Sequence, residues 1–254
     1  MHRLILSILL ALTIVRTGES VNATEFKGPQ DVQYRSCLAL VNRKPEDAFE
    51  AASAWRDRGG GFPAKHCAAL ALVALGHHGD AAGRLERLAE EMQATGDPLR
   101  PEVLGQAGNA WLLAGQHERA HGVFTAALAL QPDNVDLLID RARASAALGR
   151  FAAAIPDLDR AIGRDGGRAD AYAYRASARR QSGDAAGALA DAEAALRIDP
   201  REIEALLERG ILRAANGDRA GARADWMIVV TEAAGTPAGD AAQRNLERLD
   251  LRSR

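Results

Sequence analysis

Two histidines have the spacing needed to hold a metal ion. His117 and His121 stand four residues apart, so a helix would place both imidazoles on one face. No glutamate or cysteine completes a zinc pattern around them, and no glycine-rich phosphate loop follows a strand. Serine, histidine and aspartate residues occur, but nothing in the sequence brings them together as a catalytic group. We therefore expect no metal site, no cofactor and no enzymatic activity.

The two cysteines of the chain, Cys37 and Cys67, are a disulfide candidate. An even number of cysteines in an oxidising compartment favours pairing, and closing a loop of this size would stabilise the fold by roughly 3–4 kcal/mol. The alternative is two buried free thiols, because cysteine also packs as a small hydrophobic residue.

Arginine and aspartate recur together at a separation of sixteen residues. Where the arginine is replaced by Ala107, the aspartate is replaced by Val123, so both charges are absent together. This joint presence and absence predicts bidentate pairs that tolerate partial burial, whereas a charged ligand groove is the weaker interpretation. The predicted structural pairs are Arg141 with Asp157, Arg175 with Asp191, and Arg209 with Asp225.

The elements that carry these residues follow a period of 34 residues, with blocks at 101–134, 135–168, 169–202 and 203–236. Small residues recur at the eighth and twentieth positions, where two helices can cross closely. A glycine recurs at the fifteenth position, between two helical stretches, where a left-handed conformation can end the first helix. Each block therefore predicts a helix–turn–helix hairpin, and a fixed period of this length is typical of a stacked solenoid. The recurring glycines are Gly115, Gly149, Gly183 and Gly217.

The blocks resemble the tetratricopeptide repeat family. The first block has that family's residue types throughout, and the later blocks depart at the eleventh position, with Ser145, Arg179 and Arg213 in place of an aromatic residue. The resemblance implies an all-α fold, a right-handed α-solenoid whose concave face is built from the first helix of each hairpin. The first block matches at Leu104, Gly108, Trp111, Ala120, Phe124, Ala127 and Pro132.

The flanking regions extend this pattern. Residues 24–100 predict degenerate hairpins of the same kind, with helices near 31–42, 45–57, 64–77 and 80–94, and a loop over 58–63. Residues 237–254 predict a capping helix and tail that cover the last repeat.

Residues 1–23 have the layout of a secretory signal peptide. A basic start precedes an apolar run from Leu4 to Val15, and Val21-Asn22-Ala23 offers small residues for cleavage. The run is too short to span a bilayer as a helix, although an uncleaved anchor remains the alternative. We expect no membrane span after removal of the signal, and a periplasmic or secreted protein.

Composition excludes one class of partner. Removal of Arg3, Arg16 and Glu19 with the signal leaves 30 basic and 33 acidic residues, which does not suggest nucleic-acid binding. The function we expect is a non-catalytic scaffold of the cell envelope that binds a peptide segment or partner protein in the concave groove. The alternative is a small-molecule-binding or metal-binding accessory subunit of an envelope complex.

The resemblance also implies where the partner binds. The family's clamp for a terminal carboxylate needs paired lysine and asparagine side chains, and of these only Asn109 is present. Asp140 and Asp170 stand where that clamp would want neutral or basic groups, so a peptide carrying lysine or arginine is favoured. The implied partner-binding residues are Gln106, Asn109, Leu113, Asp140, Arg143, Tyr174, Ser177, Arg180, Glu208 and Ile211.

Overall fold

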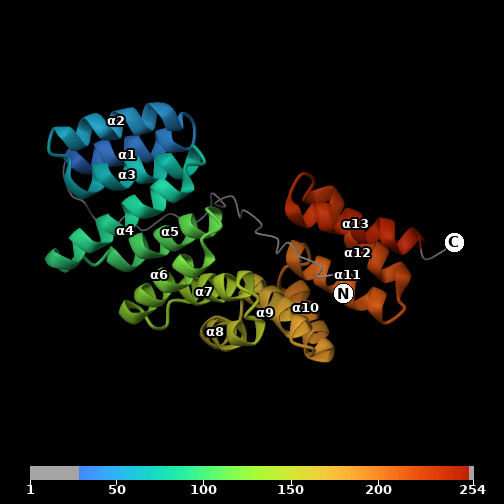
Figure 1. Ribbon diagram of the computed structural model, residues 1–254. Coiled ribbons are helices and arrows are strands. Elements are labelled where there is room, and N and C mark those ends of the chain that lie inside the picture. Colours follow the sequence, from blue (N-terminus) through green and yellow to red (C-terminus); the bar gives the residue numbers. More distant parts are fainter. Residues whose placement is uncertain (1–28, 252–254) are drawn as a thin grey trace. The chain divides into compact units, whose positions relative to one another are not determined.

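The structure is a computed structural model of the protein, and it describes residues 29–251. Over this range the chain forms thirteen helices and no strand, so the all-α prediction is confirmed (Figure 1). The signal peptide expected at residues 1–23 lies outside the described residues. The helices are α1 Pro29–Val41, α2 Pro45–Asp57, α3 Gly61–Ala74, α4 His78–Thr95, α5 Arg100–Leu113, α6 His117–Leu130, α7 Val135–Ala147, α8 Phe151–Arg164, α9 Ala169–Gln181, α10 Ala185–Ile198, α11 Ile203–Ala215, α12 Arg219–Glu232 and α13 Pro237–Leu251.

The described helices form two compact units, α1–α6 over residues 29–132 and α7–α13 over residues 133–251. Within each unit every helix packs on the next one along the chain. The division falls between the first and second 34-residue blocks, so the first block groups with the degenerate hairpins that precede it.

The recurring small residues lie where the two helices of a hairpin cross. A Cβ atom added to Gly108 would lie 2.5 Å from the Phe124 ring, and one added to Gly210 would lie 2.3 Å from the Trp226 ring. Any larger residue would separate the helices. Gly115, which ends the first helix of its block, has a φ of 71°, a value that side chains other than glycine rarely adopt.

The predicted arginine–aspartate pairs lie across their hairpins as bidentate ion pairs. The carboxylates are almost inaccessible, with 10% of the Asp157 side chain exposed, 5% of Asp191 and 3% of Asp225. Two N–H groups of one guanidinium reach both oxygens of each carboxylate, which offsets the cost of burying the charge. The donor–acceptor distances are 2.7 and 2.6 Å from Arg141 to Asp157, 2.9 and 2.7 Å from Arg175 to Asp191, and 2.9 and 2.7 Å from Arg209 to Asp225.

The arginines at the eleventh position of two blocks join these pairs. A guanidinium nitrogen of Arg179 lies 2.8 Å from Asp191, and one of Arg213 lies 2.9 Å from Asp225. From the sequence alone, these two arginines were only departures from the family's aromatic position. The structure gives the reason for the change, because a second cation can satisfy a buried aspartate better than a ring can.

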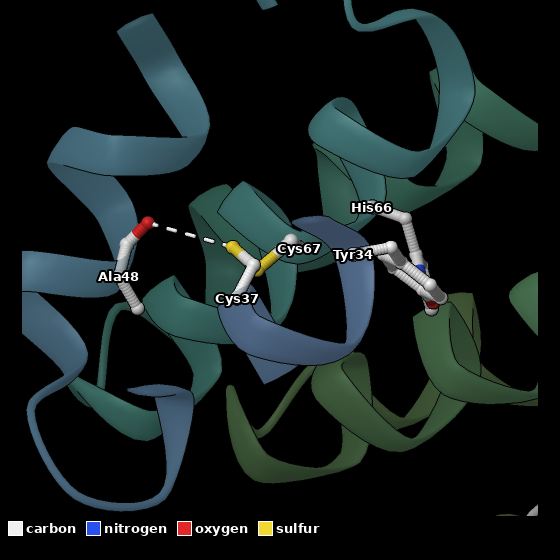
Figure 2. Close-up of a disulfide and its surroundings, with 5 residues drawn as sticks. All are labelled: Tyr34, Cys37, Ala48, His66 and Cys67. Carbon is white, nitrogen blue, oxygen red and sulfur yellow. Dashed lines mark hydrogen bonds between the residues drawn. A yellow bond between two sulfur atoms is a disulfide. The ribbon is translucent and has the colours of Figure 1, made fainter. Parts of the chain in front are cut away.

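A disulfide joins α1 to α3. Cys37 and Cys67 are bonded, with their Cα atoms 6.3 Å apart, and both residues are buried among the alanines of the first two hairpins. Figure 2 shows this bond beside the side chains of Tyr34 and His66. The cross-link ties the first helix of one hairpin to the first helix of the next.

A loop was expected over residues 58–63, and this expectation is wrong for residues 61–63, which are helical. Helix α3 begins at Gly61, so Phe62 and Pro63 lie in its first turn. Proline is tolerated there because its missing N–H would have no partner in the helix. Gly60 permits the tight entry, since a Cβ atom at this residue would lie 2.6 Å from the Trp55 side chain.

The last helix, α13, packs against α11 and α12. Its apolar residues Leu246 and Leu249 are buried in one cluster with Trp226 and Val229 of α12. Covering the last hairpin in this way removes apolar surface from water at the end of the array. None of the helices between residues 29 and 251 has the length and hydropathy that crossing a membrane requires.

Candidate partner-binding surface

The first helices of the second unit bring an aromatic ring, a guanidinium and several carboxyl groups together. Arg143 of α7 forms an ion pair of 2.8 Å with Asp140, one turn away on the same helix. The same guanidinium lies over the ring of Tyr174 on α9, 5.6 Å from the ring centroid. An arginine stacked on a tyrosine in this way gains a cation–π attraction and fixes the orientation of both side chains.

Acidic side chains surround Tyr174. Burial raises the pKa of its hydroxyl group, and the negative charges of Glu204, Asp170 and Glu202 raise it further, against the opposing effect of Arg143. The tyrosine therefore stays neutral and can donate or accept a hydrogen bond. It offers a flat apolar face with a polar tip, which is a common anchor at protein interfaces.

Two of these carboxyl groups are close to each other. Burial raises the pKa of Glu202 to about 8, and its hydrogen bond to Glu204 and the charges of Glu204, Asp170 and Asp199 act in the same direction. Glu202 stands at the N-cap of α11, and Glu204 lies in the first turn of that helix. Glu202 therefore holds a proton at pH 7 and shares it with Glu204. A basic side chain brought between them would favour release of that proton and pair with the carboxylates, so this part of the surface favours a basic side chain.

Two of the implied partner-binding residues, Arg180 and Glu208, form an ion pair with each other. Arg180 of α9 donates two hydrogen bonds to Glu208 of α11, at 2.5 and 3.1 Å, and Glu208 is only 6% exposed. Glu208 is therefore largely inaccessible to a partner, whereas its arginine stays half-buried. Ser177 and Ile211 are also half-buried on the same two helices.

In the first unit Gln106 belongs to a chain of hydrogen bonds across three helices. The hydroxyl group of Tyr34 on α1 lies 2.5 Å from Nδ1 of His66 on α3, and Nε2 of His66 is bonded to the side-chain oxygen of Gln106 on α5. Burial lowers the pKa of His66. A neutral imidazole fits both bonds, since Nδ1 then accepts from the tyrosine and Nε2–H donates to the glutamine.

A small pocket of about 50 Å³ lies beside this chain, lined by Tyr34 and His66 and by apolar residues such as Leu88 and Met92. Glu102 also lines the pocket, and burial raises the pKa of its carboxyl group. Asn109 and Leu113, the other implied contacts in this unit, are half-buried on α5.

Tyr34 and His66 were not predicted from the sequence, but the sequence contains a signal for the histidine. The stretch beginning at Gly79 repeats the stretch beginning at Gly183, 104 residues later, and the same shift places His66 on Asp170. The repeat pattern therefore places His66 and Asp170 on corresponding turns of the first helices of their hairpins. Among residues 29–251 no group of three or more histidine, cysteine or acidic side chains could hold a metal ion.

This arrangement of helical hairpins stacked in sequence defines an α-solenoid of the kind that repeat proteins form. Two tetratricopeptide repeat family models match the chain, one over residues 68–135 and the other over residues 112–178. These matches identify tetratricopeptide repeats within residues 68–178 of the chain. The fold prediction of an all-α solenoid is thereby confirmed.

Solved structures agree on the fold. TTC0263, a thermophilic tetratricopeptide repeat protein of Thermus thermophilus, is 20% identical with a TM-score of 0.57, covering 72% of this chain and 95% of its own. MamA is 20% identical with a TM-score of 0.56, covering 68% and 92%. YrrB, described as having an unusual peptide-binding site, is 16% identical with a TM-score of 0.53, covering 83% and 96%. No curated protein matches the sequence.

Proposed function

We propose that this protein is a non-catalytic scaffold of the cell envelope that binds an extended peptide segment carrying lysine or arginine. The tetratricopeptide fold supports the general role, because such solenoids are protein-interaction scaffolds. YrrB, which shares the fold, is described as having a peptide-binding site. The layout of residues 1–23 supports export, which makes the envelope the proposed location.

One observation carries the choice of ligand. The ring of Tyr174 lies under the guanidinium of Arg143, and Asp170, Glu202 and Glu204 act on its hydroxyl group. Asp170 is paired with Arg168, whereas Glu202 and Glu204 share a hydrogen bond, so this surface combines an apolar anchor with two acidic groups that a basic side chain could meet. A basic side chain placed there would neutralise the crowded carboxyl groups, and the tyrosine ring would contact its aliphatic stem.

The proposal is tested with a library of acetylated, amidated nonapeptides in which one position at a time is fixed. Pools with fixed lysine or arginine are expected to bind most tightly. The Tyr174→Ala and Glu204→Gln variants are each expected to weaken that binding about tenfold or more, the loss of one buried contact or charge partner. Tyr174→Phe keeps the ring and should bind nearly as the wild type does.

The matched control is Glu193→Gln, which removes an exposed carboxylate from α10, a second helix of its hairpin. If this variant weakens binding as much as Glu204→Gln, the preference reflects overall charge rather than the surface around Tyr174. Equal binding of basic and acidic pools would contradict the proposal. Export is tested separately by sequencing the N-terminus of the purified protein, where a start near Thr24 is expected.

A further inference from the structure

Besides the small pocket beside His66, the first unit has a larger groove, and the two linings share no residue. It has a volume of about 880 Å³ and lies between α4 and α6, with α5 beneath it. Leu104, Trp111 and Val123 line it with buried apolar side chains. Gly83 and Gly122 line it from the two flanking helices, and their missing side chains leave room above α5.

Trp111 has a buried hydrogen-bond donor with no acceptor. The residue is 6% exposed, and its Nε1 atom is buried without a hydrogen-bond partner among residues 29–251. Buried N–H groups in proteins are almost always paired, because leaving one unpaired forfeits its hydration with nothing in return. No described group accepts a hydrogen bond from this N–H, and Trp111 belongs to the lining of the groove.

The repeat pattern shows why this donor is unpaired only here. Trp111 stands at the eleventh position of its block, where later blocks have Arg179 and Arg213 bonded to a buried aspartate. In the first block the aspartate's place is taken by Val123, which lines the groove. The block that lacks the internal carboxylate is therefore the block with an unpaired donor, and an external carboxylate would replace the missing one.

Basic side chains flank the donor. The guanidinium of Arg119 lies over the Trp111 ring, 4.7 Å from its centroid, and Arg87 lines the opposite wall. Neither arginine forms an ion pair within the described part of the chain. Glu86 and Glu90 also line the groove from α4, so the positive charge is concentrated on the side of Arg119 rather than spread evenly.

We propose that the groove between α4 and α6 is a second docking site, which takes a segment of a protein partner carrying an aspartate or glutamate side chain. The carboxylate accepts a hydrogen bond from Nε1 of Trp111 and pairs with Arg119, and the flanking apolar atoms of the segment cover Leu104 and Val123. Charge-assisted bonds of this kind are stronger than bonds between neutral groups. This site is separate from the surface around Tyr174, and it takes the opposite charge.

Gly122 offers a variant that fills the groove without disturbing the fold. A Cβ atom added there would meet nothing within 4 Å, and replacing a glycine inside a helix raises helix propensity. Gly122→Leu is therefore expected to fold and to block the site. Gly163→Leu is the matched control, because Gly163 lies within α8 and its added Cβ atom would also meet nothing within 4 Å.

The test uses random twelve-residue peptides displayed on phage and selected on the immobilised full chain. Selected peptides are synthesised with and without glutamine in place of each acidic residue, and they are titrated into the protein. We expect a group of acidic peptides whose affinity falls at least tenfold in Gly122→Leu, in Arg119→Gln and in the glutamine-substituted peptide. Gly163→Leu and Tyr174→Ala should leave their affinity unchanged.

A second measurement observes the donor directly. The indole N–H resonance of Trp111, assigned with the Trp111→Phe variant, is expected to move downfield when an acidic peptide binds. Peptides that bind Gly122→Leu with unchanged affinity, or that leave this resonance in place, overturn the site. If peptides without acidic residues move the resonance, the ligand group is not a carboxylate. If the protein dimerises and Gly122→Leu abolishes the dimer, the groove binds a second copy of this chain rather than another protein. A selection that yields no acidic peptides overturns the proposal.

Discussion

Arg179 and Asp191 lie on the two helices of one hairpin, with a guanidinium nitrogen 2.8 Å from a carboxylate oxygen. Arg175 already holds the same carboxylate with two hydrogen bonds, so two arginines share one buried aspartate. Asp157 in the preceding block has the same place, but among residues 29–251 only Arg141 is bonded to it, because the position of the second arginine is occupied by Ser145. The two hairpins therefore differ in how much they depend on a single arginine.

This difference predicts unequal costs for equivalent substitutions. Arg141→Ala removes the arginine of Asp157 and leaves a buried charge unpaired, so we expect it to lower the free energy of unfolding by about 3 kcal/mol. Arg175→Ala leaves Arg179 on Asp191, and its bond to the exposed Asp159 is worth little, so a loss of about 1 kcal/mol is expected. Urea denaturation of both variants measures the difference, and equal losses would contradict the shared-aspartate arrangement.

A double-mutant cycle tests the pairing itself. Asp191→Ala leaves two arginines without their carboxylate, and adding Arg175→Ala then removes one of those unpaired cations. We expect the double variant to be less destabilised than the sum of the two single variants, with a coupling free energy of about 1 kcal/mol. Additive losses would show that the two side chains do not stabilise each other.

The disulfide between Cys37 and Cys67 is expected to stabilise the first unit alone. Replacing both cysteines by serine should cost about 3–4 kcal/mol, because the unfolded chain regains the freedom of a loop of 30 residues. Amide hydrogen exchange measured by mass spectrometry is expected to speed up within residues 29–132 and to stay unchanged within residues 133–251. Faster exchange around Trp226, in the second unit, would show that the cross-link acts beyond its own unit.

The sequence predicted the helices best where the repeat is regular. From residue 101 onward each of the four predicted blocks corresponds to one observed pair of helices, since glycine and small residues recur at fixed positions. Before residue 101 the pattern is weaker, and the start of α3 was misplaced because Gly60, Gly61 and Pro63 are signals for a loop as well as for a helix start. Local composition cannot decide between them, whereas the packing of Gly60 on Trp55 does.

The sequence placed the implied partner-binding residues on first helices, but it did not predict which of them pair with each other. The family resemblance placed Arg180 and Glu208 on the first-helix face as separate contacts, and the structure joins them to each other. Spacing of 28 residues carries no evident signal for such a pair, because it depends on how two neighbouring hairpins are packed. The hydrogen bond between Tyr34 and His66 depends in the same way on the stacking of α1 against α3.

His66 predicts that the first unit weakens in acid. Burial lowers its pKa in the folded protein below the value of about 6.5 in the unfolded chain, so the unfolded chain binds the proton more readily. Stability should therefore fall as the pH drops below 6.5, by roughly 1.4 kcal/mol for each pKa unit of difference. The His66→Gln variant should lose this pH dependence, whereas replacing the exposed His77 by glutamine should retain it. Exchange rates within residues 29–132 at pH 5 and pH 7 provide the measurement.

Glu202 predicts the opposite response in the second unit. Its folded pKa of about 8 lies above the unfolded value of about 4.3, so between these values the folded protein holds a proton that the unfolded chain releases. The contribution of this group to stability is therefore largest at low pH and is lost as the pH rises toward 8. Glu202→Gln mimics the protonated carboxyl group, and we expect it to raise the free energy of unfolding at pH 8 by at least about 1.4 kcal/mol relative to its effect at pH 4.

The control for this prediction is the exposed Glu193, whose replacement by glutamine should change stability equally at both pH values. Denaturation followed through Trp226, the one tryptophan beyond residue 132, reports on the second unit. A Glu202→Gln variant with the same pH profile as the wild type would show that Glu202 and Glu204 are both ionised at neutral pH. The surface around Tyr174 would then carry one more negative charge, and its preference for a basic peptide would be stronger at pH 7 than the structure implies.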